Sequence, residues 1–186
     1  MNSIGRVRFG IGLLVLAALA AAPGDARAQS LWHFREAHAA SQRGDYDTAI
    51  REYTLAIDAG DLPHPDSFFA FNNRANAYAA KRDWDHAVQD YSEALRRNPK
   101  FAAARRNRGL VYTRKGDHEL AIQDFTEAAR LDPDDPHALI YRGVVYCERR
   151  EFDRAIRDFD AALGLCPTCP GAVNGRAAAA AGRDCR

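Results

Sequence analysis

Residues 102–135 read AAARRNRGLVYTRKGDHELAIQDFTEAARLDPDD, and residues 136–169 read PHALIYRGVVYCERREFDRAIRDFDAALGLCPTC. When the two segments are aligned, Tyr112 matches Tyr146 and Pro133 matches Pro167, a step of 34 residues in each case (146 − 112; 167 − 133). A fixed period of this length is typical of chains built from stacked helix–turn–helix units. The sequence therefore predicts an all-α solenoid, which offers a surface to other molecules rather than a catalytic pocket.

The same unit occurs twice more upstream. Residues 68–101 keep the step of 34, and residues 30–63 follow it more weakly, with Ala40 and Asp61 where the other units have an aromatic residue and a proline. The prolines suit the ends of second helices, because proline cannot continue a helical hydrogen-bond ladder. Numbered within each unit, positions 8, 11, 20, 24, 27 and 32 carry Ala75, Tyr78, Ala87, Tyr91, Ala94 and Pro99; Gly109, Tyr112, Ala121, Phe125, Ala128 and Pro133; and Gly143, Tyr146, Ala155, Phe159, Ala162 and Pro167.

This pattern of small, aromatic and proline positions resembles the tetratricopeptide repeat. The resemblance implies a right-handed superhelical solenoid of helix–turn–helix repeats over residues 29–186. The repeats are expected at about 30–63, 68–101, 102–135 and 136–169, followed by a capping helix at 170–186. Atypical terminal repeats are expected in such an array, because each must face water on one side.

The first 28 residues have the features of a secretory signal peptide. Arg6 and Arg8 precede an uncharged apolar run from 9 to 22, and Ala26 and Ala28 stand where signal peptidase requires small residues. The alternative is a membrane anchor, which we disfavour because the run is shorter than the roughly 20 residues that span a bilayer. We expect cleavage after Ala28, no membrane insertion afterwards, and a periplasmic or secreted protein.

The charge balance is close to neutral. The chain has 26 Lys+Arg and 25 Asp+Glu; without residues 1–28 these become 23 and 24, a net charge of −1 (23 − 24). Such a balance gives no electrostatic footprint for nucleic acid. The sequence also contains no nucleophile–base pair, phosphate-binding loop, metal-ligand pattern or cofactor motif. We therefore expect a non-enzymatic protein whose partner is a protein or a peptide, and no cofactor or metal.

The resemblance implies a concave groove lined by the first helix of each repeat. An adaptor of this kind would bind a partner peptide or helix there, and asparagine and arginine side chains could hold an extended peptide by its main chain. The positions that face the groove in the family correspond here to Phe34, His38, Phe69, Asn72, Asn76, Arg106, Leu110, Arg114, His137, Ile140, Val144 and Glu148.

Some tetratricopeptide domains use a two-carboxylate clamp for chaperone C-termini. In this chain Asn76 and Asn107 match the two asparagines of that clamp. Asn72, His137 and Tyr141 replace its three basic residues, so the clamp is broken.

A charged pair recurs in register along the repeats. Arg74, Arg108 and Arg142 occupy position 7, and Asp90, Asp124 and Asp158 occupy position 23. An arginine row could bind a ligand, but aspartates that recur in step favour a structural ladder of ion pairs.

All four cysteines lie in the last quarter of the chain, and an even number in an exported protein suggests disulfides, with three possible pairings. Within the solenoid, Cys147 and Cys185 are expected at one end of the stack and Cys166 and Cys169 at the other, which favours the pairs Cys147–Cys185 and Cys166–Cys169. Cys166 and Cys169 also form a C-x-x-C motif. The alternative function is therefore a redox-active accessory protein that uses this pair.

Overall fold

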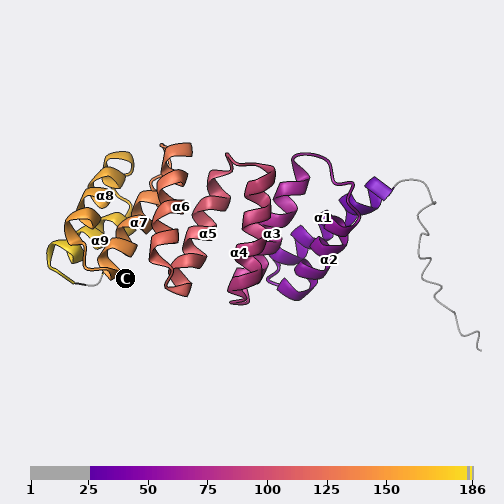
Figure 1. The fold of residues 1–186 in the computed structure, drawn as a ribbon, viewed down its shortest axis with the longest axis horizontal. Helices are drawn as coiled ribbons and strands as arrows, with labels where there is room; N and C mark the ends of the chain where they lie inside the picture. The colour runs from indigo at the N-terminus through magenta and orange to yellow at the C-terminus, as the bar shows by residue number, and fades with distance from the viewer. Residues whose placement is uncertain (1–25, 184, 186) are drawn as a thin grey trace, which may run out of the picture.

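The computed structural model describes residues 26–183 and residue 185. Over these residues the chain forms nine α-helices and no strand, laid out in a row from α1 to α9 (Figure 1). This is the all-helical solenoid that the period predicts. The helices are α1 (Ala26–Gln42), α2 (Tyr46–Asp58), α3 (Asp66–Ala80), α4 (Trp84–Arg97), α5 (Ala102–Lys115), α6 (His118–Leu131), α7 (His137–Glu148), α8 (Phe152–Leu165) and α9 (Pro170–Ala180).

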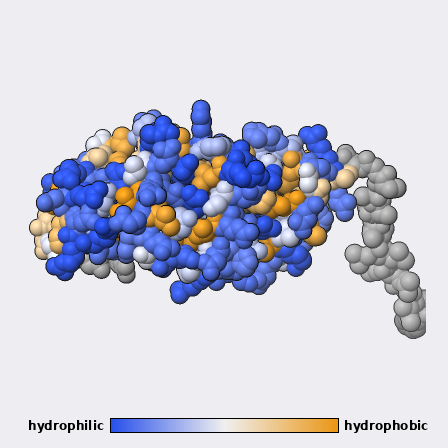
Figure 2. Space-filling view, viewed as in Figure 1, coloured by the Kyte–Doolittle hydropathy of each residue, from blue (hydrophilic) through white to orange (hydrophobic). Residues whose placement is uncertain are grey.

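The helices pack in order along the row. Each helix contacts the next one in the chain, and the first helices of successive pairs (α1, α3, α5, α7 and α9) also touch one another. The first helices therefore form one continuous side of the stack. On the face shown in Figure 2 the surface is predominantly hydrophilic, and hydrophobic residues are scattered over it instead of forming one broad patch.

Close approach of the two helices in a pair explains the small residue at position 8. A Cβ added to Gly109 would lie 2.8 Å from the ring of Phe125, and one added to Gly143 would lie 2.9 Å from the ring of Phe159. Both rings are fully buried. Because protein interiors are close-packed, glycine is what allows a large ring to fill the gap between these helices.

The turns within each pair use left-handed backbone at one residue. Gly116 has φ +82°, as glycine readily does, whereas Arg82 and Arg150 adopt φ of 62° and 61° at equivalent places. In two pairs an aspartate then caps the second helix: the side chains of Asp45 and Asp83 accept hydrogen bonds from the backbone N–H groups of Thr48 and His86.

The predicted arginine–aspartate ladder is confirmed, and its side chains are largely buried between the helices. Arg108 Nε and Nη2 donate to the two carboxylate oxygens of Asp124 at 2.7 and 2.8 Å, and Nη1 donates to Ser92 Oγ at 2.8 Å. The Arg108 and Asp124 side chains are only 18% and 5% exposed. The same arrangement joins Arg74 to Asp90 and Thr54, and Arg142 to Asp158 and Thr126. Each arginine thus ties its own helix pair to the preceding one.

The predicted signal peptide lies almost entirely outside the described residues, and only Ala26–Ala28 fall inside them, in the first turn of α1. Among the helices that are described, none combines the length and the apolar character needed to span a bilayer. The capping helix is shorter than predicted: α9 ends at Ala180, and Gly182 turns the chain with φ +64°. Cys185 therefore lies in the tail that follows α9 and not in the helix.

Candidate binding groove

A cavity of about 340 Å³ opens at the junction of α3, α4 and α5. Three of the predicted groove residues, Asn76, Leu110 and Arg114, line it. The structure adds residues that the groove positions of the first helices did not include. These are Ala79, Trp84, Tyr91, Asn107 and Val111, of which Trp84 and Tyr91 come from the second helix α4.

A hydrogen-bond network fixes the polar wall of this cavity. Tyr91 Oη donates to Asn76 Oδ1 at 2.5 Å, and Asn107 Nδ2 donates to the same oxygen at 3.2 Å. Burial raises the pKa of the Tyr91 phenol, so the phenol remains a donor at neutral pH. Within the part of the chain that the structure describes, Asn76 Nδ2 and Asn107 Oδ1 have no hydrogen-bond partner, so one donor and one acceptor are open to a ligand. Tyr91 at position 24, where later repeats have Phe125 and Phe159, is the sequence signal for this network.

The charge in the cavity comes from Arg114. This side chain is exposed and makes no ion pair with any residue that the structure describes. The apolar wall is formed by Leu110, Val111 and Trp84. The cavity therefore combines an open amide donor, an open amide acceptor, a cation and an apolar wall.

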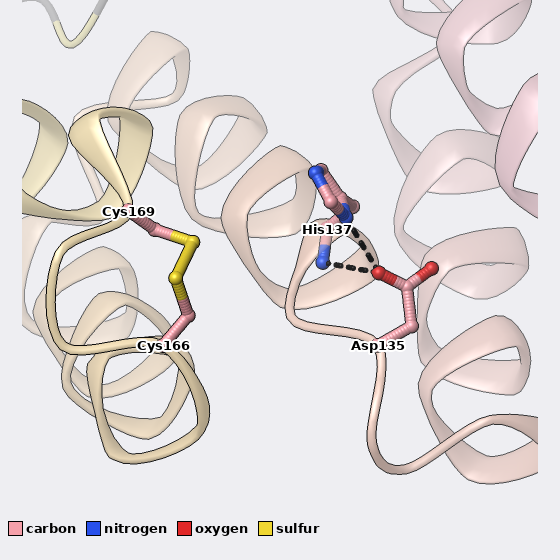
Figure 3. The surroundings of a disulfide bond; sticks show 4 residues. All are labelled: Asp135, His137, Cys166 and Cys169. Carbon is pink, nitrogen blue, oxygen red and sulfur yellow. Dashed lines mark hydrogen bonds and ion pairs between the residues drawn. A yellow bond between two sulfur atoms is a disulfide. The ribbon is translucent and has the colours of Figure 1, made fainter.

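Two other predicted groove residues meet at one aspartate. Arg106 forms an ion pair with Asp135. The other oxygen of Asp135 accepts a hydrogen bond from the backbone N–H of His137 at 3.0 Å and lies 2.6 Å from His137 Nδ1 (Figure 3). Arg106 is thereby held by its own chain, which the sequence pattern did not indicate.

The remaining predicted groove residues are spread along the stack. Phe34 packs edge-on to Tyr53, and Phe69 packs against Phe68 and Phe101. His38 is exposed and lies beside Gln42. The structure buries two residues, Asn72 and Ile140, so that they contribute packing and little open surface; Val144 is half-buried against the same core as Ile140.

The next junction has different side chains at the equivalent positions. Tyr141 stands at position 6, where Asn107 stands in the preceding repeat, and its ring centroid lies 5.8 Å from that of Phe125. Glu148, at the position equivalent to Arg114, lies 3.5 Å from His118 Nδ1. A bulky ring and a charge of the opposite sign therefore distinguish this junction from the cavity.

The structure joins Cys147 to Cys185 and Cys166 to Cys169, with Cα separations of 5.8 and 5.4 Å. The Sγ of Cys185 lies 3.3 Å from the carbonyl oxygen of Gly175, so the tail lies against α7 and α9. The Cys166–Cys169 pair closes the turn between helices α8 and α9 (Figure 3), whereas the cavity is lined by residues from 76 to 114. This setting does not favour the redox hypothesis.

Within the described part of the chain, His, Cys, Asp and Glu form no cluster suited to a metal ion.

Comparison with known proteins agrees with this architecture. The family profile described as "Tetratricopeptide repeat" matches residues 72–136 and 119–172, which together span more than half of the chain. Photosystem I assembly protein Ycf3 of Prochlorococcus marinus (strain MIT 9211) is 33% identical over 72 residues, which are 39% of this chain and 41% of that protein. The chain thus spans less than half the length of that curated relative.

Two solved structures share the fold at low sequence identity. The crystal structure of MamA superposes with a TM-score of 0.75 at 19% identity, covering 83% of this chain and 82% of that one. YrrB, described as a TPR protein with an unusual peptide-binding site, superposes with a TM-score of 0.68 at 19% identity, covering 82% of this chain and 76% of that one. At this identity the likeness concerns the fold alone.

Proposed function

Because the chain belongs to the tetratricopeptide repeat family, whose members mediate protein–protein interactions, we propose that it is an exported, non-catalytic adaptor that binds an extended segment of a partner protein. The observation that carries the proposal is the cavity between α3 and α5, where Asn76, Asn107 and Arg114 converge beside an apolar wall. Binding centres on this cavity, and the predicted groove residues that remain exposed, such as His38, extend the contact along the first helices.

The chemistry of the cavity matches a peptide in extended form. The open Asn76 Nδ2 donor and the open Asn107 Oδ1 acceptor complement the carbonyl and N–H groups of one peptide unit. An apolar side chain of the partner packs on Leu110 and Val111, and a carboxylate pairs with Arg114. The description of YrrB as a peptide-binding TPR protein supports a peptide ligand for a solenoid of this shape.

Export is supported by the leader-like residues 1–28 and by four cysteines placed in two pairs. Disulfides persist in oxidising compartments such as the bacterial periplasm. The proposed adaptor therefore works in the periplasm or in the secreted fraction, on partners that are themselves exported.

The test is site-specific photo-crosslinking in the native host, with the photoreactive residue at position 114. The control places it at position 123, because Gln123 is exposed on the second helix α6. We expect one discrete protein to be captured from position 114 and not from position 123. The captured segment, synthesised as a peptide, should then bind the purified protein.

Two arginine substitutions test whether the partner binds in the cavity or elsewhere on the surface. Arg114→Ala should weaken binding of that peptide about tenfold or more, because charge-assisted hydrogen bonds contribute roughly 1.5–3 kcal/mol. The matched control is Arg130→Ala, another exposed arginine, on α6. Capture from both positions alike, or equal losses in the two variants, would show that the partner binds elsewhere.

A further inference from the structure

Two further cavities lie along α8. One cavity, of about 350 Å³, is lined by residues from α6, α7 and α8, among them Ile122, Thr126 and Tyr146. The other, of about 430 Å³, lies along the start of α8. The two cavities share Arg154 and Arg157, so they form one continuous feature, here termed the α6–α8 groove. Its walls are largely second helices, whereas the candidate binding groove lies between first helices.

The charges in this groove do not balance. Arg142 is neutralised by the two oxygens of Asp158, both at 2.7 Å. Arg154 pairs with Glu151 at 2.7 Å, and its guanidinium carbon lies 4.3 Å from the centre of the Tyr146 ring. Arg157 is exposed and has no ion pair or hydrogen bond with any residue in the described part of the chain. Arg150 and Asp153 also line the groove, so its charged side chains are four arginines and three carboxylates, and one positive charge is left over.

Comparison between repeats shows that this excess is local. Arg154 and Arg157 occupy positions 19 and 22 of their repeat, where the preceding repeat has Leu120 and Gln123. The second repeat has His86 and Gln89 at these positions, and the first has Thr48 and Arg51. Two arginines three residues apart on a helix face repel each other slightly. The fold requires neither residue, because the other repeats form the same helices without the pair.

We propose that the α6–α8 groove binds a short acidic segment of a partner protein, with a carboxylate at Arg157. Guanidinium groups hold carboxylates through paired hydrogen bonds, and Ile122 and Tyr146 offer a wall for an adjacent apolar side chain. A long polyanion fits less well, because Glu151 and Asp153 line the second cavity and the chain without residues 1–28 has a net charge of −1 (23 − 24). A nucleic acid or an anionic membrane would meet this repulsion, whereas a single carboxylate avoids it.

The test uses a fluorescein-labelled peptide in which glutamates flank one leucine, titrated with the purified protein and followed by fluorescence anisotropy. We expect saturable binding that Arg157→Gln weakens about tenfold, the effect of losing one charge-assisted hydrogen bond. The matched control is Arg51→Gln, which removes an exposed arginine from the same position of the first repeat and should leave the affinity unchanged.

Further measurements decide where the peptide binds and which class of ligand the groove accepts. Arg114→Ala reports on binding of the same peptide in the candidate binding groove; a loss with that variant and none with Arg157→Gln would overturn the proposal and place the peptide there. Absence of saturable binding by the wild-type protein would also overturn it. So would binding of a DNA duplex or of phosphatidylglycerol vesicles that depends on Arg157 while the acidic peptide fails to bind.

Discussion

At the scale of single residues, the most consequential feature is the repeated arginine–aspartate pair. Arg108 bonds Asp124 in its own helix pair and Ser92 in the preceding one, so one side chain connects three helices. Asp124 is buried, Arg108 is 18% exposed, and the hydrogen bonds between them are bidentate. The recurrence of arginine and aspartate at fixed positions of the repeat predicted which residues pair. Their burial could not be read from the register, because it depends on how closely the neighbouring helices approach.

We predict that Asp124→Ala lowers the free energy of unfolding by about 3–5 kcal/mol, because it leaves the buried guanidinium of Arg108 without its counter-charge. The control is Asp85→Ala, since Asp85 pairs with Lys115 but its side chain is 85% exposed. Exposed pairs contribute about 0–1 kcal/mol, so the control should change little. Urea unfolding followed by circular dichroism measures both variants. A loss at Asp124 no larger than that at Asp85 would contradict the structural role of the buried pair.

At the scale of helices, the recurring prolines and turns predicted the element boundaries well. Helices α4, α6 and α8 end at Arg97, Leu131 and Leu165, each two residues before the proline of its repeat. The last helix is the exception. It is a short helix rich in alanine, and much of its surface is exposed, including Val173 at 45%. Because α9 buries so little apolar surface, its stability depends on other connections to the preceding helices.

We predict that Cys185→Ser releases the tail and destabilises α9. The Cys147–Cys185 bond joins residues 38 apart, and the loop-closure model for such a spacing gives about 4 kcal/mol. Urea unfolding measures the loss, and limited proteolysis should show earlier cleavage after α8. Replacing Cys166 and Cys169 by serine is the control, because a separation of 3 residues closes a much smaller loop and should cost less. In a non-reduced digest analysed by mass spectrometry, a linked Cys147–Cys166 peptide would refute this pairing.

At the scale of the whole molecule, the described part of the solenoid has several hydrophobic cores instead of one. Its buried apolar residues form separate clusters along the row, from one around Tyr53 to one around Phe159. Each helix contacts only its neighbours in the stack. The stability of such an array is approximately a sum of local and nearest-neighbour terms. A destabilising substitution at one end should therefore have only a small effect on the stability of the other end.

The two tryptophans allow a test of this locality. Trp32 lies on α1 and Trp84 on α4, both in the first two helix pairs. We predict that Phe159→Ala, which empties a fully buried site at the C-terminal end, costs about 3–5 kcal/mol locally. In urea, circular dichroism should then show an earlier transition than tryptophan fluorescence. Tyr91→Ala, in the same cluster as Trp84, should shift both signals. Coincident shifts for Phe159→Ala would instead mean that the stack unfolds as one cooperative unit.

The sequence by itself determined the period, the helix pairs, the ends of the second helices α4, α6 and α8, and the partners in the charged ladder. These follow from local chemistry that recurs every 34 residues, so a residue's place in the unit reveals its helix and its face. Only the tertiary structure decided which groove positions are open: Asn76 and Arg114 line a cavity, Asn72 and Ile140 are buried, and Arg106 is held by Asp135. The physical reason is that accessibility depends on side chains from adjacent repeats. Asn107 lines the cavity at one junction, whereas Tyr141, at the same position of the next repeat, packs near the ring of Phe125.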